Sequence, residues 1–312
     1  MNSDKPQITF AIPYYKGKSF LYSAIRSVID QNLTDWNLII IDDSSGADNV
    51  EDLVREFKDT RISYLKNPKN LGMAETWNRC IHEAKTELVT ILHNDDVVLP
   101  NYAVEMIAAH KKFSEASAYF CDTKIICKDG IERFSFPDLI KKFIHKNQNP
   151  LSKISGEDGL TKLLKGNFIF CPSICYNKSK LNGLKFNSNW KMVLDLEFTT
   201  SLLLNDSYLI GLPVVAFNYR RHGENASAIY TTSMLRFKEE IALYDELLDR
   251  IRAKNWVRAE EVALKKRIIK LGLIYSATSD LAKFKFSNFK KKAIFLRSLL
   301  GAKFKSKSDQ HI

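Results

Sequence analysis

Short apolar runs alternate with amphipathic segments through the first third of the chain. Four runs rich in aliphatic and β-branched residues predict buried strands, at 8–12, 38–41, 62–65 and 87–92. Between and after them, apolar residues recur with the spacing of one helix face. The predicted helices are one that carries Leu21, Ile25, Val28 and Ile29 on one face, and those at 48–58, 73–85 and 100–113. This alternation indicates βαβ units and a mostly parallel, Rossmann-like sheet of the α/β class.

Polar and acidic residues follow directly after the predicted strands. They are Pro13, Tyr15, Asp42, Asp43, Asn70, Asp95 and Asp96. Right-handed crossovers place the carboxyl ends of parallel strands at one edge of the sheet, so we expect these side chains to converge on one crevice. In open α/β sheets, that edge is where ligands bind.

The segment His93–Asp96, with the sequence His-Asn-Asp-Asp, is the most informative strand end. Adjacent carboxylates there suit Mg²⁺ or Mn²⁺, which prefer hard oxygen ligands, and such an ion could hold a diphosphate. The alternative is a turn that caps the next helix. No glycine loop offers another phosphate site, because Gly17-Lys18-Ser19 lacks the earlier glycine of a P-loop and no Gly-x-Gly-x-x-Gly occurs.

The pattern changes after residue 115. The segments 118–127 and 131–136 flank Lys-Asp-Gly at 128–130, which predicts a hairpin. The other predicted elements are helices at 156–165 and 193–204, an apolar segment at 168–176, a strand at 214–219, and helices from 232 to about 300.

The net charge of +11 is concentrated at one end of the 312-residue chain. From Ala253 onward there are 15 Lys and Arg against 4 Asp and Glu, while residues 1–252 hold 32 of each kind. Between 283 and 307, phenylalanines and lysines interleave, as in basic amphipathic segments that bind anionic bilayers. The asymmetry predicts an acidic partner, a membrane surface or nucleic acid; a solvated helical appendage is the alternative.

The N-terminal segment is polar and shows no signal-peptide pattern, and no apolar run reaches the roughly 18 residues of a membrane span. Five cysteines at spacings that match no zinc or disulfide framework predict buried, reduced thiols. We therefore expect a cytoplasmic protein, peripheral to the inner face of the cell membrane if the basic tail binds there.

Several short sequence blocks occur in a specific order along residues 8–100. They are Ile12-Pro13-Tyr14-Tyr15, Ser27-Val28-Ile29-Asp30-Gln31, residues 39–45 (Ile-Ile-Ile-Asp-Asp-Ser-Ser), Asn70-Leu71-Gly72, and residues 91–96 (Ile-Leu-His-Asn-Asp-Asp), ending at Pro100. Together they resemble the N-terminal half of family 2 glycosyltransferases, which have the GT-A fold. The resemblance extends more loosely to about residue 228 and does not cover the basic tail.

This resemblance implies a domain organisation. A GT-A catalytic domain would occupy residues 1–230, with a nucleotide-sugar half at 1–115 and an acceptor half at 116–230. A basic helical C-terminal extension would follow at 231–312.

The resemblance also implies a donor site at the first strand ends. Pro13 and Tyr15 would line the nucleoside pocket, with Tyr15 stacking on the base. Asp43 would accept a hydrogen bond from the base imide, and Asp42 would support that turn; the alternative for both is helix N-capping. Asn70 would lie near the ribose or the diphosphate, or serve as a plain turn residue.

The end of the fourth predicted strand corresponds to the metal site of the family. His93 takes the first position of its Asp-x-Asp motif, and Asp95 takes the second, which is expected to contact Mn²⁺ or Mg²⁺. Asn94 and Asp96 are assigned to donor binding in the same segment. The resemblance therefore implies a metal-dependent donor site despite the histidine.

Two later blocks resemble elements of relatives. In Tyr219–Ser227, Arg221 would face the diphosphate and His222 would be an extra metal ligand, unless the block is a solvated loop. Asn167 and Pro172-Ser173 would shape the acceptor side.

The resemblance implies that Asp195 is the catalytic base, which the family takes from a later helix. Glu197 lies two residues on and faces away from Asp195, so only one of the two can point into the site. The alternative is a surface carboxylate. A positioned carboxylate that removes the proton of an acceptor hydroxyl typically contributes about 10²–10⁴-fold, and a metal stabilises the departing diphosphate. A single base opposite the leaving group predicts inversion at the anomeric carbon.

These expectations combine into an inverting hexosyl- or N-acetylhexosaminyltransferase. It would move a sugar from a nucleotide-diphosphate donor, a UDP-sugar, to a surface polysaccharide, such as capsule or lipopolysaccharide, or to a lipid-linked saccharide. A sugar nucleotidyltransferase is the enzyme alternative, although residues 13–19 lack its Gly-rich loop. A nucleic-acid-binding protein acting through the tail is the other, and no nucleic acid is expected because the tail carries no recognition motif.

Overall fold

The computed structural model of the protein describes residues 5–44, 46, 48–132, 152–223 and 225–301. The chain divides into two compact units. The first comprises residues 1–163 and 167–222, and the second comprises residues 164–166 and 223–312. The domain boundary expected at residue 230 stays a prediction.

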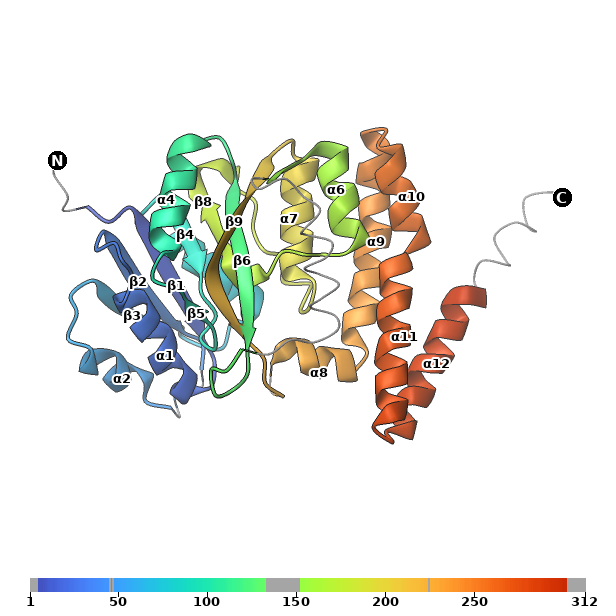
Figure 1. Ribbon diagram of the computed structural model, residues 1–312, viewed down its shortest axis with the longest axis horizontal. Coiled ribbons are helices and arrows are strands. Elements are labelled where there is room, and N and C mark those ends of the chain that lie inside the picture. The colour runs from blue at the N-terminus through green and yellow to red at the C-terminus, as the bar shows by residue number, and fades with distance from the viewer. Residues whose placement is uncertain (1–4, 45, 47, 133–151, 224, 302–312) are drawn as a thin grey trace. The chain divides into compact units, whose positions relative to one another are not determined.

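A mixed sheet forms the centre of the first unit (Figure 1). Its nine strands among the described residues are β1 (Ile8–Tyr14), β2 (Trp36–Asp42), β3 (Ile62–Lys66), β4 (Leu88–Ile91), β5 (Val97–Val98), β6 (Ala118–Ile126), β7 (Ser152–Ser155), β8 (Ile174–Asn177) and β9 (Tyr208–Arg220). They follow the order β3-β2-β1-β4-β8-β6-β9-β5, with β7 paired to β9. Strands β1 to β4 pair in parallel, which confirms the βαβ half, whereas β8 lies antiparallel between β4 and β6.

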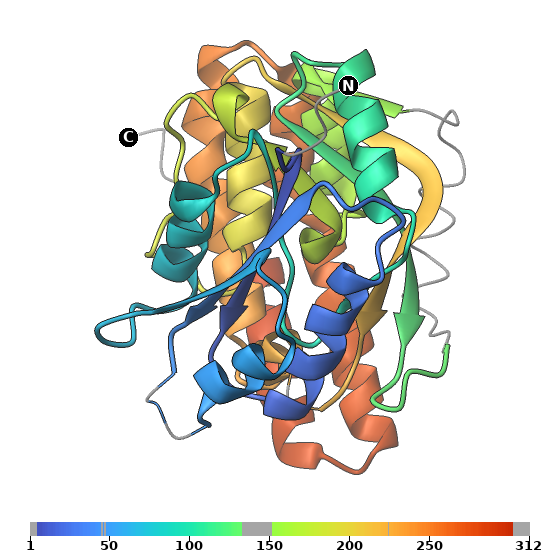
Figure 2. The same ribbon diagram turned by 90° about the vertical axis from the view of Figure 1, so that its left-hand side faces the viewer.

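Helices cover both faces of this sheet (Figure 2). They are α1 (Lys18–Ile29), α2 (Val50–Glu56), α3 (Met73–Glu83), α4 (Tyr102–Lys112), α6 (Gly156–Lys165) and α7 (Leu194–Leu204), with 3₁₀ turns at Cys171–Ser173 and Lys178–Lys180. Alternate β1 residues, such as Phe10 and Ile12, are buried in one core with the apolar faces of α1, α2 and α4. Helices α3 and α7 lie on the opposite face. Each fully buried aliphatic side chain contributes roughly 1.5–3 kcal/mol, so these stripes hold the layers together.

The Ser27–Gln31 block connects α1 to the chain that leaves the β4 loop. Gln31 Nε2 donates to Leu99 O at 2.8 Å, and Gln31 Oε1 accepts from Ala103 N at 2.9 Å. Ser27 Oγ also accepts from Val98 N at 3.3 Å. This block therefore fixes the path of the chain immediately after the acidic segment.

Some local elements differ from the predicted pattern. Strands β5 and β7 were not predicted, because two to four residues carry too little periodicity to be recognised. The turn at 128–130 is confirmed by Gly130 N donating to Cys127 O at 3.0 Å. Residues 133–136 of the expected second hairpin strand lie outside the described residues.

The second unit is helical, as the sequence predicted from residue 232. Its helices in the described part of the chain are α8 (Ala226–Thr232), α9 (Leu235–Ala253), α10 (Val257–Lys265), α11 (Arg267–Ala282) and α12 (Phe286–Gly301). Phe237, Leu247 and Leu273 are among its buried residues. Within the ranges that the structure covers, none of the chain's helices has both the length and the apolar character to cross a bilayer.

Candidate active site

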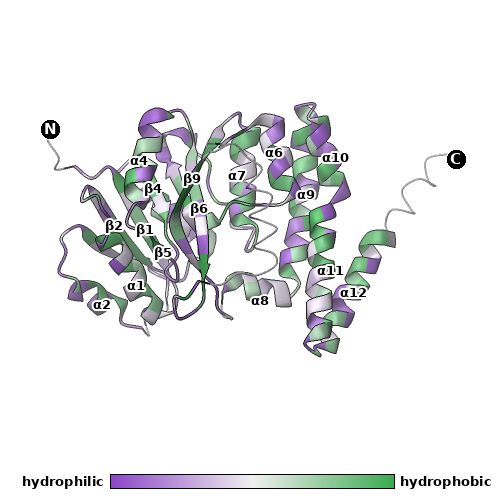
Figure 3. Ribbon diagram, viewed as in Figure 1, coloured by the Kyte–Doolittle hydropathy of each residue, from purple (hydrophilic) through white to green (hydrophobic). Residues whose placement is uncertain are grey.

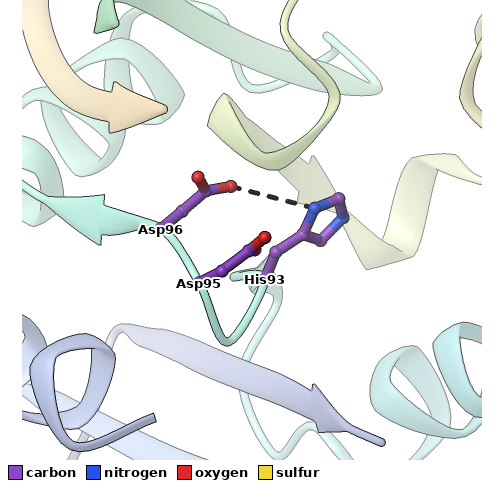
Figure 4. A group of neighbouring side chains, drawn as sticks. All are labelled: His93, Asp95 and Asp96. Carbon is purple, nitrogen blue, oxygen red and sulfur yellow. Dashed lines mark ion pairs between the residues drawn. The ribbon is translucent and has the colours of Figure 1, made fainter. Parts of the chain in front are cut away.

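Strand β4 delivers the segment His93–Asp96 to the carboxyl edge of the sheet. Its four residues are buried between β1 and β8. The chain then turns, with Asp96 N donating to His93 O at 3.2 Å. Figure 4 shows the side chains of His93, Asp95 and Asp96 gathered at this turn.

Asp96 is fully buried beneath this turn. Its Oδ1 accepts from Arg220 N at 2.7 Å. Its Oδ2 has no hydrogen-bond partner among the described residues and lies 3.8 Å from His93 Nδ1. Burial raises the pKa of Asp96 well above its ordinary value, and the charge of Asp95 raises it further. Asp96 therefore fixes the loop to β9 through Oδ1, while its Oδ2 keeps acceptor capacity beneath the turn.

His93 is held against the aromatic ring of Trp77 on α3. The two rings stack with centroids 5.2 Å apart. His93 Nε2 is buried and has no hydrogen-bond partner among the described residues. Burial lowers the pKa of His93, an effect opposed by the charge of Asp95. A neutral imidazole keeps a nitrogen lone pair that can bind a cation.

Asp95 and His222 meet although 127 residues separate them. Strand β9 ends at Arg220, and His222 Nε2 then lies 3.0 Å from Asp95 Oδ2. Both side chains are largely buried, with 12% of His222 and 20% of Asp95 exposed. The ring of Phe20, at the start of α1, stacks on His222 with centroids 4.8 Å apart. The two residues assigned to the metal are thus brought together.

Arg220, which the sequence analysis overlooked in favour of Arg221, fixes this arrangement. Its Nε donates to Asp95 O at 2.8 Å, and a terminal nitrogen donates to Lys128 O at 2.8 Å. Its backbone nitrogen is the partner of Asp96 Oδ1. Arg221 lies more exposed, with its guanidinium carbon 5.9 Å from the ring centre of Tyr219. An arginine that ends an apolar strand was the available signal, but the Arg-Arg pair left two candidates.

The residues at this edge fit a divalent cation. One ligand atom from each of His93, Asp95 and Asp96 lies within 4.8 Å of the others, and His222 approaches Asp95 from β9. Asp96 Oδ2 is buried without a hydrogen-bond partner in the described part of the chain and faces His93 Nδ1 at 3.8 Å, and such an oxygen is costly unless something binds it. Imidazole favours transition metals and carboxylates favour Mg²⁺ or Mn²⁺, so the mixed set suits Mn²⁺.

The carboxylates of Asp42 and Asp43 are engaged by the protein itself. Asp43 accepts from Asn67 Nδ2 at 2.6 Å, Leu71 N at 2.7 Å and Gly72 N at 3.0 Å. Asp42 accepts from the hydroxyl of Tyr64 at 2.6 Å and from Ser44 N at 2.8 Å. Both are buried. The helix-capping alternative is wrong, because α2 begins after Asn49 and has no side-chain cap.

The other predicted donor residues surround the same strand ends. Tyr15 is 60% exposed directly after β1, and Pro13 is half-buried. Asn70 Nδ2 donates to Asp43 O at 2.9 Å, which fixes the 67–72 loop beside β2. Asn94 Nδ2 donates to Lys16 O at 2.8 Å. Asn94 therefore joins the acidic segment to the loop that carries Tyr15.

Asp195 lies in the first turn of α7 and is half-buried. Asn167 Nδ2 donates to Asp195 Oδ2 at 3.4 Å, so the block assigned to the acceptor side contacts the expected base. Glu197 is buried and accepts from Ser201 Oγ at 2.9 Å. The two carboxylates therefore point in different directions, as their spacing predicted.

Cys171 marks the place where the two acidic elements approach each other. Its 3₁₀ turn lies against β4 and β6. Burial raises the pKa of the Cys171 thiol well above its ordinary value, and the charges of Asp195 and then Asp96 raise it further. Both carboxylates therefore act on one thiol. The five cysteines are free, and four are buried, as expected for reduced thiols.

A surface cavity of about 380 Å³ lies elsewhere, at the amino ends of β2 and β3, where Trp36, Arg61 and Ser63 contribute to its lining. The acidic segment lies at the carboxyl ends of the parallel strands. This cavity therefore plays no part in the site described above.

Comparison with known proteins places the chain in a family. Residues 9–176, more than half of the chain, match the family described as "Glycosyl transferase family 2". The chain belongs to this family.

Two curated relatives illustrate the similarity. The chain is 25% identical over 214 residues to "Uncharacterized glycosyltransferase MJ1057" of Methanocaldococcus jannaschii, covering 65% of this chain and 67% of that one. It is 27% identical over 188 residues to "GalNAc(5)-diNAcBac-PP-undecaprenol beta-1,3-glucosyltransferase" of Campylobacter jejuni, covering 59% of this chain and 56% of that one. The chain spans between about half and two thirds of the length of these relatives.

Solved structures show the same fold at low identity. S. aureus TarS 1–349 in complex with UDP-GlcNAc has a TM-score of 0.60 and 14% identity, covering 94% of this chain and 92% of that one. The mannosyltransferase PcManGT from Pyrobaculum calidifontis, in complex with GDP-Man and Mn²⁺, has a TM-score of 0.59 and 12% identity, covering 98% and 88%. The chain therefore has the GT-A fold.

Proposed function

We propose that this protein is an inverting transferase that moves a sugar from a UDP-sugar to a lipid-linked saccharide or a surface polysaccharide. The observation that carries the proposal is the pairing of Asp95 with His222, 3.0 Å apart, at the carboxyl edge of a GT-A sheet. The printed names of relatives support the reactants. The Campylobacter relative is named for an undecaprenol-linked saccharide, and the TarS complex holds UDP-GlcNAc.

Asp95 and His222 would hold Mn²⁺ or Mg²⁺, with His93 as a further nitrogen ligand. The ion, when bound, stabilises negative charge on the diphosphate leaving group as a Lewis acid. Arg220 and Asp96 would keep the Asp95 loop in position, because they bind its backbone and each other. Arg221, half-buried after β9, would add positive charge at the diphosphate.

The nucleoside would lie along the ends of β1 and β2. Tyr15 supplies an exposed ring that can stack on the base. Asp43 uses three acceptor positions for the protein, and a carboxylate offers about four, so one remains for the base imide. Asp42 and Asn70 would act by fixing the loops on either side.

Asp195 would take the proton from the acceptor hydroxyl. Asn167 holds one of its oxygens, and the turn at Cys171–Ser173, which follows Asn167, packs against β4, the strand that leads to Asp95, which supports a shared site. Attack from the side of Asp195, opposite the diphosphate, would invert the anomeric carbon. Such a base contributes about 10²–10⁴-fold.

The substitution Asp195→Asn tests the proposal. We expect transfer of labelled sugar to fall by at least about a hundredfold, while calorimetry gives the same affinity for UDP and Mn²⁺ within about twofold. The control Asp30→Asn changes an exposed carboxylate paired with Arg26 and should leave transfer unchanged. Full turnover in Asp195→Asn would refute the assignment of Asp195 as the base. Equal affinity for UDP and GDP would refute the assignment of a UDP-sugar as the donor.

A further inference from the structure

The helices α11 and α12, with the turn at 283–285, form a hairpin that we call the anchor hairpin. A buried lysine holds it together: Lys292, 3% exposed, places its Nζ 2.5 Å from Asp280 Oδ2 and 2.6 Å from Ser276 Oγ. Asp280 is the only acidic residue in 267–301, against eight Lys and Arg. The internal ion pair therefore leaves the outer surface of the hairpin without an acidic side chain.

The outward face of α11 is apolar. Leu271, Ile274, Tyr275 and Leu281 are each between 43% and 61% exposed. Their spacing of three, four and ten residues places them on one helix face, with Thr278 between them. Hydrophobic residues also make up much of α11 in Figure 3. An exposed stripe that is mostly apolar in this way indicates an interaction surface.

The rest of the hairpin surface is basic. Lys283 and Lys285 lie in the turn on either side of Phe284, and Lys290, Lys291 and Arg297 are exposed along α12. In Figure 3, hydrophilic and hydrophobic segments alternate along α12. The hairpin thus presents apolar and cationic groups side by side.

Two exposed aromatic rings lie at the turn and at the start of α12. Phe284 is 79% exposed and Phe286 is 60% exposed, and their ring centres are 6.2 Å apart. Phe284 has a φ of 58°, in the left-handed region. Lys285 N donates to Asp280 O at 2.8 Å and Phe284 N donates to Leu281 O at 3.0 Å, which is the helix ending that ordinarily takes glycine at this position.

Neither packing nor backbone geometry explains this phenylalanine. Glycine would relieve the left-handed strain, and a polar residue would avoid exposing a ring to water. A phenylalanine at this position, despite both costs, fits a contact with a binding partner.

We infer that the anchor hairpin docks the protein on an anionic lipid bilayer. Phe284 and Phe286 would enter the headgroup region, while the flanking lysines contact lipid phosphates. Basic helices with aromatic and aliphatic residues bind membrane interfaces in this way. Nucleic acid would satisfy the lysines but would give no favourable burial to Leu271 or Ile274. This inference adds a membrane partner to the proposed function. It rests on that function only where it explains access to a lipid-linked acceptor; the binding of the hairpin to a bilayer does not depend on it.

A matched pair of substitutions tests the inference. Asn255 occupies the same position in the turn between α9 and α10, with a φ of 56°, Trp256 N donating to Ile251 O at 3.2 Å, and Asn255 N donating to Arg252 O at 2.9 Å. Phe284→Gly and Asn255→Gly therefore make the same backbone change in the same unit. Both should leave the unfolding temperature unchanged or raised, because glycine relieves the left-handed strain.

Binding is measured with the full chain by co-sedimentation with vesicles of phosphatidylglycerol and phosphatidylethanolamine, against pure phosphatidylcholine vesicles. We expect the wild type to bind the anionic vesicles alone, Phe284→Gly to bind at least about tenfold more weakly, and Asn255→Gly to match the wild type. Replacing Lys283 and Lys285 with glutamine should weaken binding by about thirtyfold, since each basic residue near the surface contributes about a factor of five. Lys111→Gln with Lys112→Gln, two exposed lysines of α4, is the control for charge.

Absence of vesicle binding in the wild type would overturn the inference, as would equal binding by Phe284→Gly and Asn255→Gly. Tighter binding to a single-stranded RNA, unchanged in Phe284→Gly, would assign the surface to nucleic acid instead. Calorimetry with UDP and Mn²⁺ on the same preparations separates this result from the proposed function. Nucleotide binding without vesicle binding would refute membrane docking by the anchor hairpin alone. Vesicle binding without nucleotide binding would refute the proposed transferase site alone.

Discussion

Two pairs of adjacent aspartates end neighbouring parts of the same sheet, yet their surroundings differ. After β2, Asp43 receives three hydrogen bonds from the 67–72 loop. After β4, Asp95 faces His222 and Asp96 keeps one oxygen without a hydrogen-bond partner among the described residues. The first pair thus holds the 67–72 loop in place, whereas the second pair keeps a carboxylate oxygen that can bind an ion. The hydrogen-bond donors around a pair of carboxylates therefore decide its role, and the Asp-Asp sequence alone does not.

Asp95→Ala tests the second pair. It should abolish the enhancement of UDP binding by Mn²⁺ and reduce transfer by about a thousandfold, because Lewis-acid stabilisation of the leaving group is worth several kcal/mol. Asp42→Asn, in the first pair, should keep the Mn²⁺ enhancement. Calorimetry with and without Mn²⁺ measures both. The contrast between the pairs breaks down if Asp42→Asn loses the metal effect or if Asp95→Ala keeps it.

Arg220→Lys tests the support behind the second pair. A lysine keeps the charge but cannot contact Asp95 O and Lys128 O together, as the planar guanidinium does. We expect Mn²⁺ affinity to fall by about 10–100-fold, the usual cost of losing a group that orients a ligand. Arg221→Lys should change Mn²⁺ affinity by less than about threefold. Similar losses in both variants would contradict the assignment of Arg220.

Asp43→Asn tests the first pair. The amide cannot accept all three hydrogen bonds of the carboxylate, and charge-assisted bonds are worth about 1.5–3 kcal/mol each. We expect the free energy of unfolding in urea to fall by about 2–3 kcal/mol. Asp35→Asn, which changes a carboxylate that accepts from Gln7 at the surface, should cost less than about 0.5 kcal/mol. An unchanged unfolding free energy in Asp43→Asn would mean that its carboxylate does not hold the loop.

The parallel half of the fold was predictable because its signals are local. The run at 38–41 became the buried centre of β2, and the face of Leu21, Ile25 and Val28 became the buried face of α1. Spacing also predicted that Asp195 and Glu197 point in different directions, although the family resemblance was needed to choose Asp195. Local apolar periodicity is sufficient wherever an element packs against one continuous layer.

The support of the site was not predictable, because it depends on pairing between distant segments. Nothing near Arg220 in the sequence indicates that it, rather than Arg221, binds the Asp95 loop 125 residues earlier. The contact of Phe20 with His222 and the packing of the Cys171–Ser173 turn against β4 also join segments that are distant in the sequence. Strand β9 creates the contacts of Arg220 and His222 by pairing with β5 and β6, a topology that no motif records.

The stacking of Phe20 on His222 allows a test, with the smallest expected effect, of how the site around Asp95 and Asp96 is held. Phe20→Leu keeps an apolar side chain at the start of α1 but removes a ring whose centre lies 4.8 Å from the imidazole. Aromatic pairs of this kind contribute about 0.5–1.5 kcal/mol beyond their burial. We therefore expect Mn²⁺ affinity to fall by about two- to tenfold with UDP affinity in the absence of metal unchanged. Tyr22→Leu, two residues on and in a tilted contact with Phe57 instead, should leave both affinities unaltered. If both variants weaken Mn²⁺ equally, the effect comes from α1 as a whole, and His222 is positioned by its loop rather than by the Phe20 ring.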